Sequence, residues 1–255
     1  MSDATEVIRA SGLAKRYPPR VDALADVSLV VHRGEFVAIL GPSGAGKTTL
    51  FRCLTGLTRP DAGAVNVRGH EVSALRGRAL RTARREVALI FQQFNLVRRL
   101  SALQNVLVGR LADAPTWRVL ARRFSRADRE HALRCLDTVG LREKADTRAD
   151  QLSGGQQQRV AIARALAQDA RVILADEPVA SLDPESAATV LECLRTAVAT
   201  GVAVVASLHQ VPYACAYADR IVALRDGRVV RDVPAAGIDP RTLEHIYGKN
   251  GGPAA

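Results

Sequence analysis

The chain has 255 residues, of which 47% are hydrophobic and 24% charged, which is ordinary for a globular protein with a sizeable core. Its longest apolar run, Tyr213 to Ala218, is far shorter than the roughly 20 residues of a membrane-spanning helix, so we expect no transmembrane segment. The net charge of +10 comes from scattered arginines with only five Phe and four Tyr, which argues against nucleic-acid binding. A solvated surface or attraction to an anionic membrane face would explain the charge.

The ends of the chain and its cysteines indicate a cytosolic protein. Residues Met1 to Glu6 are polar and acidic and lack the apolar core of a signal peptide. The four cysteines form no C-x-x-C pair, so we interpret them as reduced, buried thiols and not as metal ligands. The tail, Gly248 to Ala255, is predicted to be flexible.

The first third of the chain is predicted to form an antiparallel sheet. Val7 to Val31 and Ala64 to Val72 have strand character and no helix between consecutive strands. Strands joined without a crossover helix pair antiparallel.

A glycine-rich loop between a strand and a helix predicts a phosphate-binding site. The loop follows the strand Phe36 to Leu40 and fits the pattern G-x-x-x-x-G-K-[ST]. Its glycines let backbone N–H groups approach phosphate oxygens, and the following helix directs its positive end at the anion. Lys47 would supply a charge to the outer phosphates, and the Thr48 hydroxyl could bind Mg²⁺. The predicted phosphate-binding residues are Gly41, Pro42, Ser43, Gly44, Ala45, Gly46, Lys47, Thr48 and Thr49.

Short apolar runs that alternate with helical patterns predict an α/β fold with a mostly parallel core sheet. The runs are Glu35–Gly41, Glu86–Gln92, Arg171–Asp176, Val202–His209 and Arg220–Leu224. The helix after the phosphate loop is predicted over Thr48 to Leu57, with Leu50, Leu54 and Leu57 on one face. A second helix, Gln156 to Ala167, places Val160, Ala163 and Leu166 on one face. Residues 95–166 are mainly helical and are predicted to form an inserted helical subdomain.

Two carboxylates end the apolar strand Val172 to Ala175. In enzymes with such a phosphate loop, the aspartate at this strand end holds Mg²⁺, which assigns Asp176 to the metal. If the backbone stays extended, Glu177 points the opposite way from Asp176, where it could polarise an attacking water. The alternative is a solvated loop that begins at Asp176.

A further motif carries a family resemblance. The segment Gln151 to Arg159 resembles the L-S-G-G-Q signature of ATP-binding-cassette (ABC) ATPases, and the wider pattern matches from about Ile8 to Tyr247. The resemblance implies one ATP-binding domain over residues 1–247, with ATP and Mg²⁺ as ligands. It also implies two cassettes stacked head to tail, in which the signature of one closes over the ATP of the other. The signature residues are Ser153, Gly154, Gly155 and Gln156.

The same resemblance assigns roles to four more residues. Tyr17 would stack on adenine, although a structural tyrosine is the alternative. Gln92 would sense Mg²⁺ and the membrane partner, and the neighbouring Gln93 is the alternative residue for that role. Asp183 would communicate between the two cassettes. His209 would act as the switch histidine at the γ-phosphate, and together with Glu177 and Gln92 it completes the expected catalytic set.

The segments Phe91 to Ser101, Ala175 to Ser186 and Leu208 to Ala214 resemble those of phosphonate import ATP-binding proteins. The resemblance implies a homodimer of cassettes at the cytoplasmic face of the inner membrane. Its partners would be two permease subunits and, through them, a periplasmic substrate-binding protein, with no nucleic acid. Importers of phosphite or phosphate esters, and a soluble regulatory or repair ATPase, are the alternatives.

Residues Gln92 to Ser101 are expected to dock on the permease. Four of them are more apolar than is usual in a surface loop without a binding partner, namely Phe94, Leu96, Val97 and Leu100. The alternative is that these side chains pack inside the helical subdomain.

Overall fold

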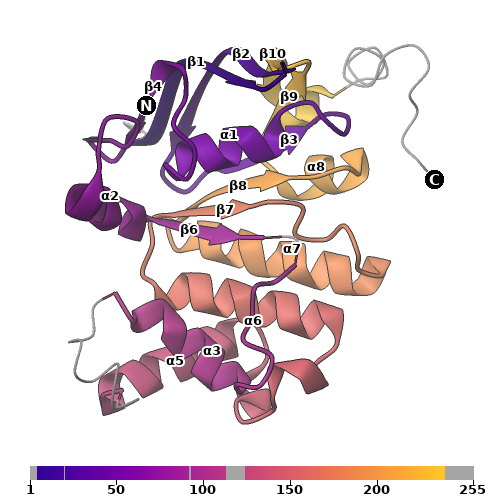
Figure 1. The fold of residues 1–255 in the computed structure, drawn as a ribbon. Coiled ribbons are helices and arrows are strands. Elements are labelled where there is room, and N and C mark those ends of the chain that lie inside the picture. Colours follow the sequence, from indigo (N-terminus) through magenta and orange to yellow (C-terminus); the bar gives the residue numbers. More distant parts are fainter. Residues whose placement is uncertain (1–4, 20, 92, 113–123, 239–255) are drawn as a thin grey trace.

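Two sheets, one antiparallel and one mostly parallel, form the body of the molecule (Figure 1). They are seen in a computed structural model, which describes residues 5–19, 21–91, 93–112 and 124–238. The antiparallel sheet has the strand order β2-β1-β4-β5, which confirms the sheet predicted for the N-terminal part. Its strands are β1 (Glu6–Tyr17), β2 (Val21–His32), β4 (Ala62–Val67) and β5 (His70–Glu71).

The core sheet has the strand order β10-β9-β3-β8-β7-β6, and every neighbouring pair except β10 with β9 is parallel. Its strands are β3 (Phe36–Leu40), β6 (Val87–Ile90), β7 (Val172–Ala175), β8 (Ala203–Ser207), β9 (Arg220–Arg225) and β10 (Arg228–Pro234). The apolar runs predicted the five parallel strands. They did not predict β10, because this edge strand is largely exposed and its sequence has no continuous apolar run.

The helices lie in layers around the core sheet (Figure 1). The helix α1 lies between the two sheets, whereas α7 covers the other face of the core sheet and α6 packs beyond it. The α-helices are α1 (Lys47–Leu54), α2 (Gly77–Ala83), α3 (Ala102–Leu107), α5 (Arg126–Thr138), α6 (Gly154–Ala167), α7 (Pro184–Ala199) and α8 (Val211–Tyr217). Single 3₁₀ turns span Arg84–Glu86, Val108–Arg110, Arg142–Lys144, Ala149–Gln151 and Ala235–Gly237. Within the described ranges, no helix has both the length and the apolar character needed to cross a bilayer.

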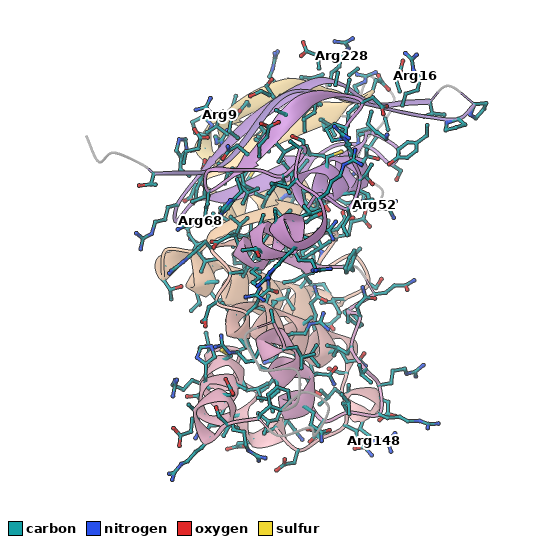
Figure 2. The ribbon with its side chains drawn as sticks, turned by 60° about the vertical axis from the view of Figure 1, so that its left-hand side comes forward. Arg9, Arg16, Arg52, Arg68, Arg148 and Arg228 are labelled. Carbon is teal, nitrogen blue, oxygen red and sulfur yellow. The ribbon has the colours of Figure 1, made fainter. Side chains whose placement is uncertain are left out.

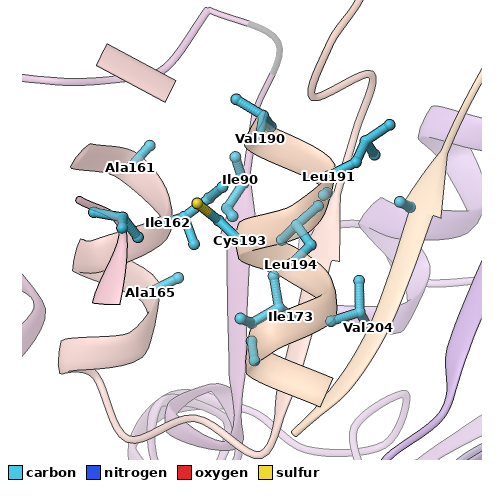
Figure 3. Close-up of a cluster of buried hydrophobic side chains, with 14 of the residues drawn as sticks. Ile90, Ala161, Ile162, Ala165, Ile173, Val190, Leu191, Cys193, Leu194 and Val204 are labelled. Atoms are coloured by element: carbon cyan, nitrogen blue, oxygen red, sulfur yellow. The ribbon is translucent and has the colours of Figure 1, made fainter. Parts of the chain in front are cut away.

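Alternation along the strands divides the interior into two apolar clusters. In β3, Phe36, Ala38 and Leu40 join the cluster on the side of α7, whereas Val37 and Ile39 join the cluster around α1. Figure 3 shows the first cluster, in which side chains of α6 and α7 meet those of the sheet. This packing fixes the carboxyl ends of the strands, where the predicted site lies.

Two details of the sequence prediction are wrong. The helix α1 ends at Leu54, and Leu57 is 51% exposed and not on its buried face. Gly56 adopts φ +67° and donates its N–H to the carbonyl of Cys53, which ends the helix in the manner of a left-handed C-terminal cap. Three cysteines are buried as predicted, but Cys215 on α8 is exposed.

The arginines are spread along the whole length of the molecule (Figure 2). Four of the labelled ones form ion pairs with nearby carboxylates, which offsets part of the positive charge locally. The pairs are Arg9 with Glu6, Arg16 with Asp22, Arg68 with Glu86, and Arg148 with Asp150. This distribution favours the solvated-surface interpretation of the net charge.

Candidate active site

The phosphate loop connects β3 to α1 and is held by the neighbouring backbone. Gly41 adopts φ +154° and Gly46 φ +103°, conformations that L-residues with side chains rarely adopt. A Cβ on Gly41 would clash with the carbonyl of Leu224 in β9, and a Cβ on Gly46 with the carbonyl of Ala23 in β2. The two glycines are therefore required for the close packing of the loop against both sheets.

Lys47 is folded back onto this loop. Its Nζ donates to the carbonyl oxygens of Gly41 at 2.7 Å and Pro42 at 3.1 Å, and the residue is 5% exposed. Burial lowers the pKa of the ammonium, and the negative charges of Glu177 and Asp176 oppose that shift. The ammonium is thus held by neutral carbonyls, which phosphate oxygens could replace as stronger, charge-assisted partners.

Residues of the phosphate loop line a cavity of about 240 Å³. Its described lining consists of Val21, Ala23, Ser43, Gly44, Ala45, Gly46, Lys47, Thr48, Thr49 and Glu177. Tyr17 is half-buried and pairs with Val21 across the β1–β2 ladder, so the residue predicted to meet adenine lies beside the cavity. Its ring also lies 5.6 Å from the Lys15 ammonium, which would leave one face for a base.

The two carboxylates follow β7 and converge on the end of β8. The expectation of extended geometry at Glu177 is wrong, because this residue adopts φ +52° in the left-handed region. Its N–H donates to the Ser207 hydroxyl at 2.7 Å, and that hydroxyl donates to Asp176 Oδ1 at 2.8 Å. The Glu177 carboxylate meets His209, with 2.6 Å between Oε1 and Nε2. The structure therefore brings Asp176, Glu177 and His209 together.

Sequence reasoning missed Ser207. It is 0% exposed and ends a strand whose other residues are all apolar. A hydroxyl at the end of a fully buried strand needs a hydrogen-bond partner, and this is the signal that could have identified it.

The donor set at this site fits Mg²⁺. The ion prefers oxygen ligands, and proteins usually bind it through one or two carboxylates together with substrate phosphates. Asp176 supplies a carboxylate directly after β7, and Thr48, which carries a hydroxyl, lines the cavity. The described residues contain no group of three or more His, Cys, Asp or Glu that would form an all-protein metal cage. Gln92, the third predicted metal contact, lies outside the described residues.

The signature lies at the start of α6. None of its residues is among the described residues that line the cavity. Ser153 caps the helix: its hydroxyl accepts the N–H of Gln156, whose side chain in turn accepts the N–H of Ser153. Gly155 is buried against Ser186 of α7, and a Cβ there would lie 2.9 Å from the Ser186 side chain. At this helix start Ser153 is exposed, and Gly154 and Gln156 are half-buried.

Asp183 caps α7, the helix against which the signature packs. Its carboxylate accepts the N–H of Ser186 at 2.9 Å, and this hydrogen bond lowers the pKa of the carboxyl group. The residue is exposed, as an interface role would also require. Its predicted role between cassettes stays a prediction.

Residues 93–101 are the described part of the expected docking segment. Two polar side chains hydrogen-bond to the backbone of this segment. Arg164 of α6 donates to the carbonyls of Asn95 at 2.6 Å and Phe94 at 3.1 Å, and burial lowers the pKa of its guanidinium. Asn105 of α3 is 0% exposed and bonds both the N–H and the carbonyl of Val97. Leu96 packs against the core cluster, as the alternative interpretation required, whereas Val97 is 52% exposed.

Comparisons with known proteins show which family this chain resembles. The family model described as "ABC transporter" matches residues 24–180. The hypophosphite import ATP-binding protein of Stutzerimonas stutzeri is 50% identical over 94% of this chain and 70% of its own length. The phosphonates import ATP-binding protein of Shigella sonnei is 49% identical over 94% of each chain. Among solved structures, the dimeric post-hydrolysis state of the ATP-binding cassette MJ0796 with ADP and Pi has a TM-score of 0.79 and 35% identity, covering 91% of this chain and 100% of that chain.

Proposed function

The chain belongs to the ABC transporter family of ATP-hydrolysing cassettes, and on that premise we propose that it powers the import of phosphonates across the inner membrane. The observation that carries this proposal is that Glu177, whose carboxylate contacts His209, lines the same cavity as the Lys47 loop. Such a site can bind a nucleotide and direct a water molecule at its terminal phosphate.

The residues divide the work of hydrolysis. Lys47 exchanges its loop carbonyls for the outer phosphates, and the loop N–H groups bind the remaining oxygens. Glu177 orients the attacking water, while His209 fixes the Glu177 carboxylate. Mg²⁺, when bound, would be held by Thr48, Asp176 and Gln92 and would neutralise charge on the phosphates. ADP and phosphate leave after hydrolysis.

A second copy of the chain completes the proposed site. The signature residues Ser153, Gly154, Gly155 and Gln156 lie at a helix start where Ser153 is exposed, and none of them is among the described residues that line the chain's own cavity. The N–H groups at such a helix start favour an anion. In the proposed head-to-tail homodimer they would contact the ATP held by the partner. A dimeric structure of the similar cassette MJ0796 supports this arrangement.

The cargo assignment derives from the relatives. The phosphonates import ATP-binding proteins of Shigella sonnei and of Cupriavidus pinatubonensis are both 49% identical to this chain. Hypophosphite is the second candidate, because the hypophosphite import protein is similarly close, at 50% identity. We propose two permease subunits and a periplasmic phosphonate-binding protein as partners, and the cytoplasmic face of the inner membrane as the location.

Growth experiments test the cargo. Deletion of the gene should abolish growth on an alkylphosphonate as the sole phosphorus source and spare growth on orthophosphate. Normal growth on phosphonate, in a strain without a second importer, would contradict the phosphonate assignment. Loss of growth on hypophosphite alone would favour the second candidate.

Residues 93–101 are the proposed docking surface for the permease. Val97 is exposed while its backbone is held by Asn105, so the segment presents an apolar side chain on a fixed support. Val97→Ser should weaken co-purification with the permease and leave ATP binding intact. Leu57→Ser is a matched control, because Leu57 is 51% exposed and lies outside the segment. An intact complex with Val97→Ser would exclude a major contribution from this side chain.

A further inference from the structure

Ser207 is the one polar residue of β8, the strand Ala203–Ser207, and its side chain is fully buried. It lies at the carboxyl end of the strand, where Ile39 of β3 pairs with it on one side and the two carboxylates that follow β7 lie on the other. A hydroxyl has one hydrogen to donate and two lone pairs to accept with. Here the hydrogen goes to Asp176 Oδ1 and a lone pair receives the N–H of Glu177.

These two bonds join groups with different tasks. Asp176 is the proposed metal ligand, and Glu177 is the proposed group that orients water. Glu177 also adopts φ +52°, a backbone conformation that costs free energy for a residue with a long side chain. Such a conformation persists only where surrounding contacts hold it, and the bond from the Glu177 amide to Ser207 is such a contact.

We propose that Ser207 is a positioning residue that fixes the metal-binding carboxylate and the hydrolytic carboxylate relative to each other. Its bond to Asp176 leaves one orientation of that carboxylate favoured, as expected for a group that hydrogen-bonds a metal ligand. Its bond to the amide of Glu177 fixes the turn from which the Glu177 side chain reaches His209. The hydroxyl thus couples the geometry of metal binding to that of water activation.

This inference rests on the proposed roles of Asp176 and Glu177. The role of Glu177 is tested separately by Glu177→Gln, and the role of Asp176 by Asp176→Asn, which should weaken Mn²⁺ binding. If Glu177→Gln retains hydrolysis, the proposed hydrolytic role fails, whatever Ser207 does. If Glu177→Gln abolishes hydrolysis, the Ser207 variants then test the inference alone.

The experiment compares Ser207→Ala with Ser207→Thr in the full chain. Ser207→Ala should lower kcat by about 10- to 100-fold, and it should weaken Mn²⁺ binding by a similar factor, which is the usual effect of removing a group that orients a metal ligand. Mn²⁺ binding is measured by electron paramagnetic resonance with a non-hydrolysable ATP analogue, so this readout does not depend on turnover. Affinity for the analogue without metal should change by less than about threefold, because Ser207 is not among the described cavity-lining residues. Ser207→Thr keeps the hydroxyl and should restore both quantities to within about threefold of the wild type.

Ser73→Ala is the matched control. The Ser73 hydroxyl, like that of Ser207, accepts a backbone N–H, that of Val65 in β4, and donates to a carboxylate, that of Glu71. Ser73 is not among the described residues that line the cavity. This variant should leave kcat and Mn²⁺ affinity unchanged. Wild-type kcat and Mn²⁺ affinity in Ser207→Ala would overturn the proposal. So would a folded Ser207→Thr that is as defective as Ser207→Ala, because packing and not the hydroxyl would then matter.

Discussion

Replacing Asn105 by alanine should destabilise the protein and loosen the segment 93–101. The Asn105 side chain accepts the N–H of Val97 and donates to the carbonyls of Val97, Leu100 and Ser101. Its amide nitrogen has only two hydrogens, so these contacts amount to three full hydrogen bonds at most. At about 0.5–1.5 kcal/mol for each hydrogen bond, and with partly buried backbone groups left unpaired, we expect a loss of about 2–4 kcal/mol in the free energy of unfolding.

Urea unfolding followed by circular dichroism measures this loss as a shift of the midpoint at constant slope. Asn66→Ala is the matched control, since the Asn66 side chain accepts one N–H, that of Gly69, in an exposed turn, and it should cost less than about 1 kcal/mol. In the Asn105 variant, hydrogen exchange should also accelerate at the amides of the segment. A loss below about 1 kcal/mol, or unchanged exchange, would refute the view that Asn105 supports the docking surface.

Three further variants test the nucleotide site. Glu177→Gln should keep ATP binding and lower hydrolysis by about 10²- to 10⁴-fold, with an ATP-trapped dimer visible by gel filtration, and hydrolysis at the wild-type rate would remove Glu177 from the mechanism. Ser153→Arg should stop hydrolysis while ATP affinity of the monomer in an equilibrium titration stays nearly unchanged, and a large loss of that affinity would place the signature at its own nucleotide. Gly46→Ala should abolish ATP binding, because the added Cβ would clash with the Ala23 carbonyl at a φ of +103°, and retained affinity measured by calorimetry would contradict the packing described for the loop.

Local sequence patterns determined the phosphate loop and most of the core. The strand, the glycines, Lys47 and the start of α1 are adjacent in the chain, so their chemistry and spacing suffice to predict a phosphate site. The buried parallel strands were predictable for a similar reason, since burial on both faces requires a continuous apolar run. The edge strand β10 has no such requirement and was not predicted.

The geometry of the acidic pair was decided only by the tertiary structure. The sequence predicts opposite directions for Asp176 and Glu177 only if the backbone stays extended. In the structure the hydroxyl of Ser207, 30 residues further along the chain, accepts the N–H of Glu177, whose backbone is in the left-handed region. The contact between Glu177 and His209 likewise joins the ends of neighbouring strands that are distant in sequence. The hydrogen bonds from Asn105 and Arg164 to residues 93–101 also depend on the tertiary structure. The sequence therefore determined which chemical groups are present and where the chain forms strands and helices. Packing of distant segments decided which groups meet, because a hydrogen bond between them depends on distances that no local pattern records.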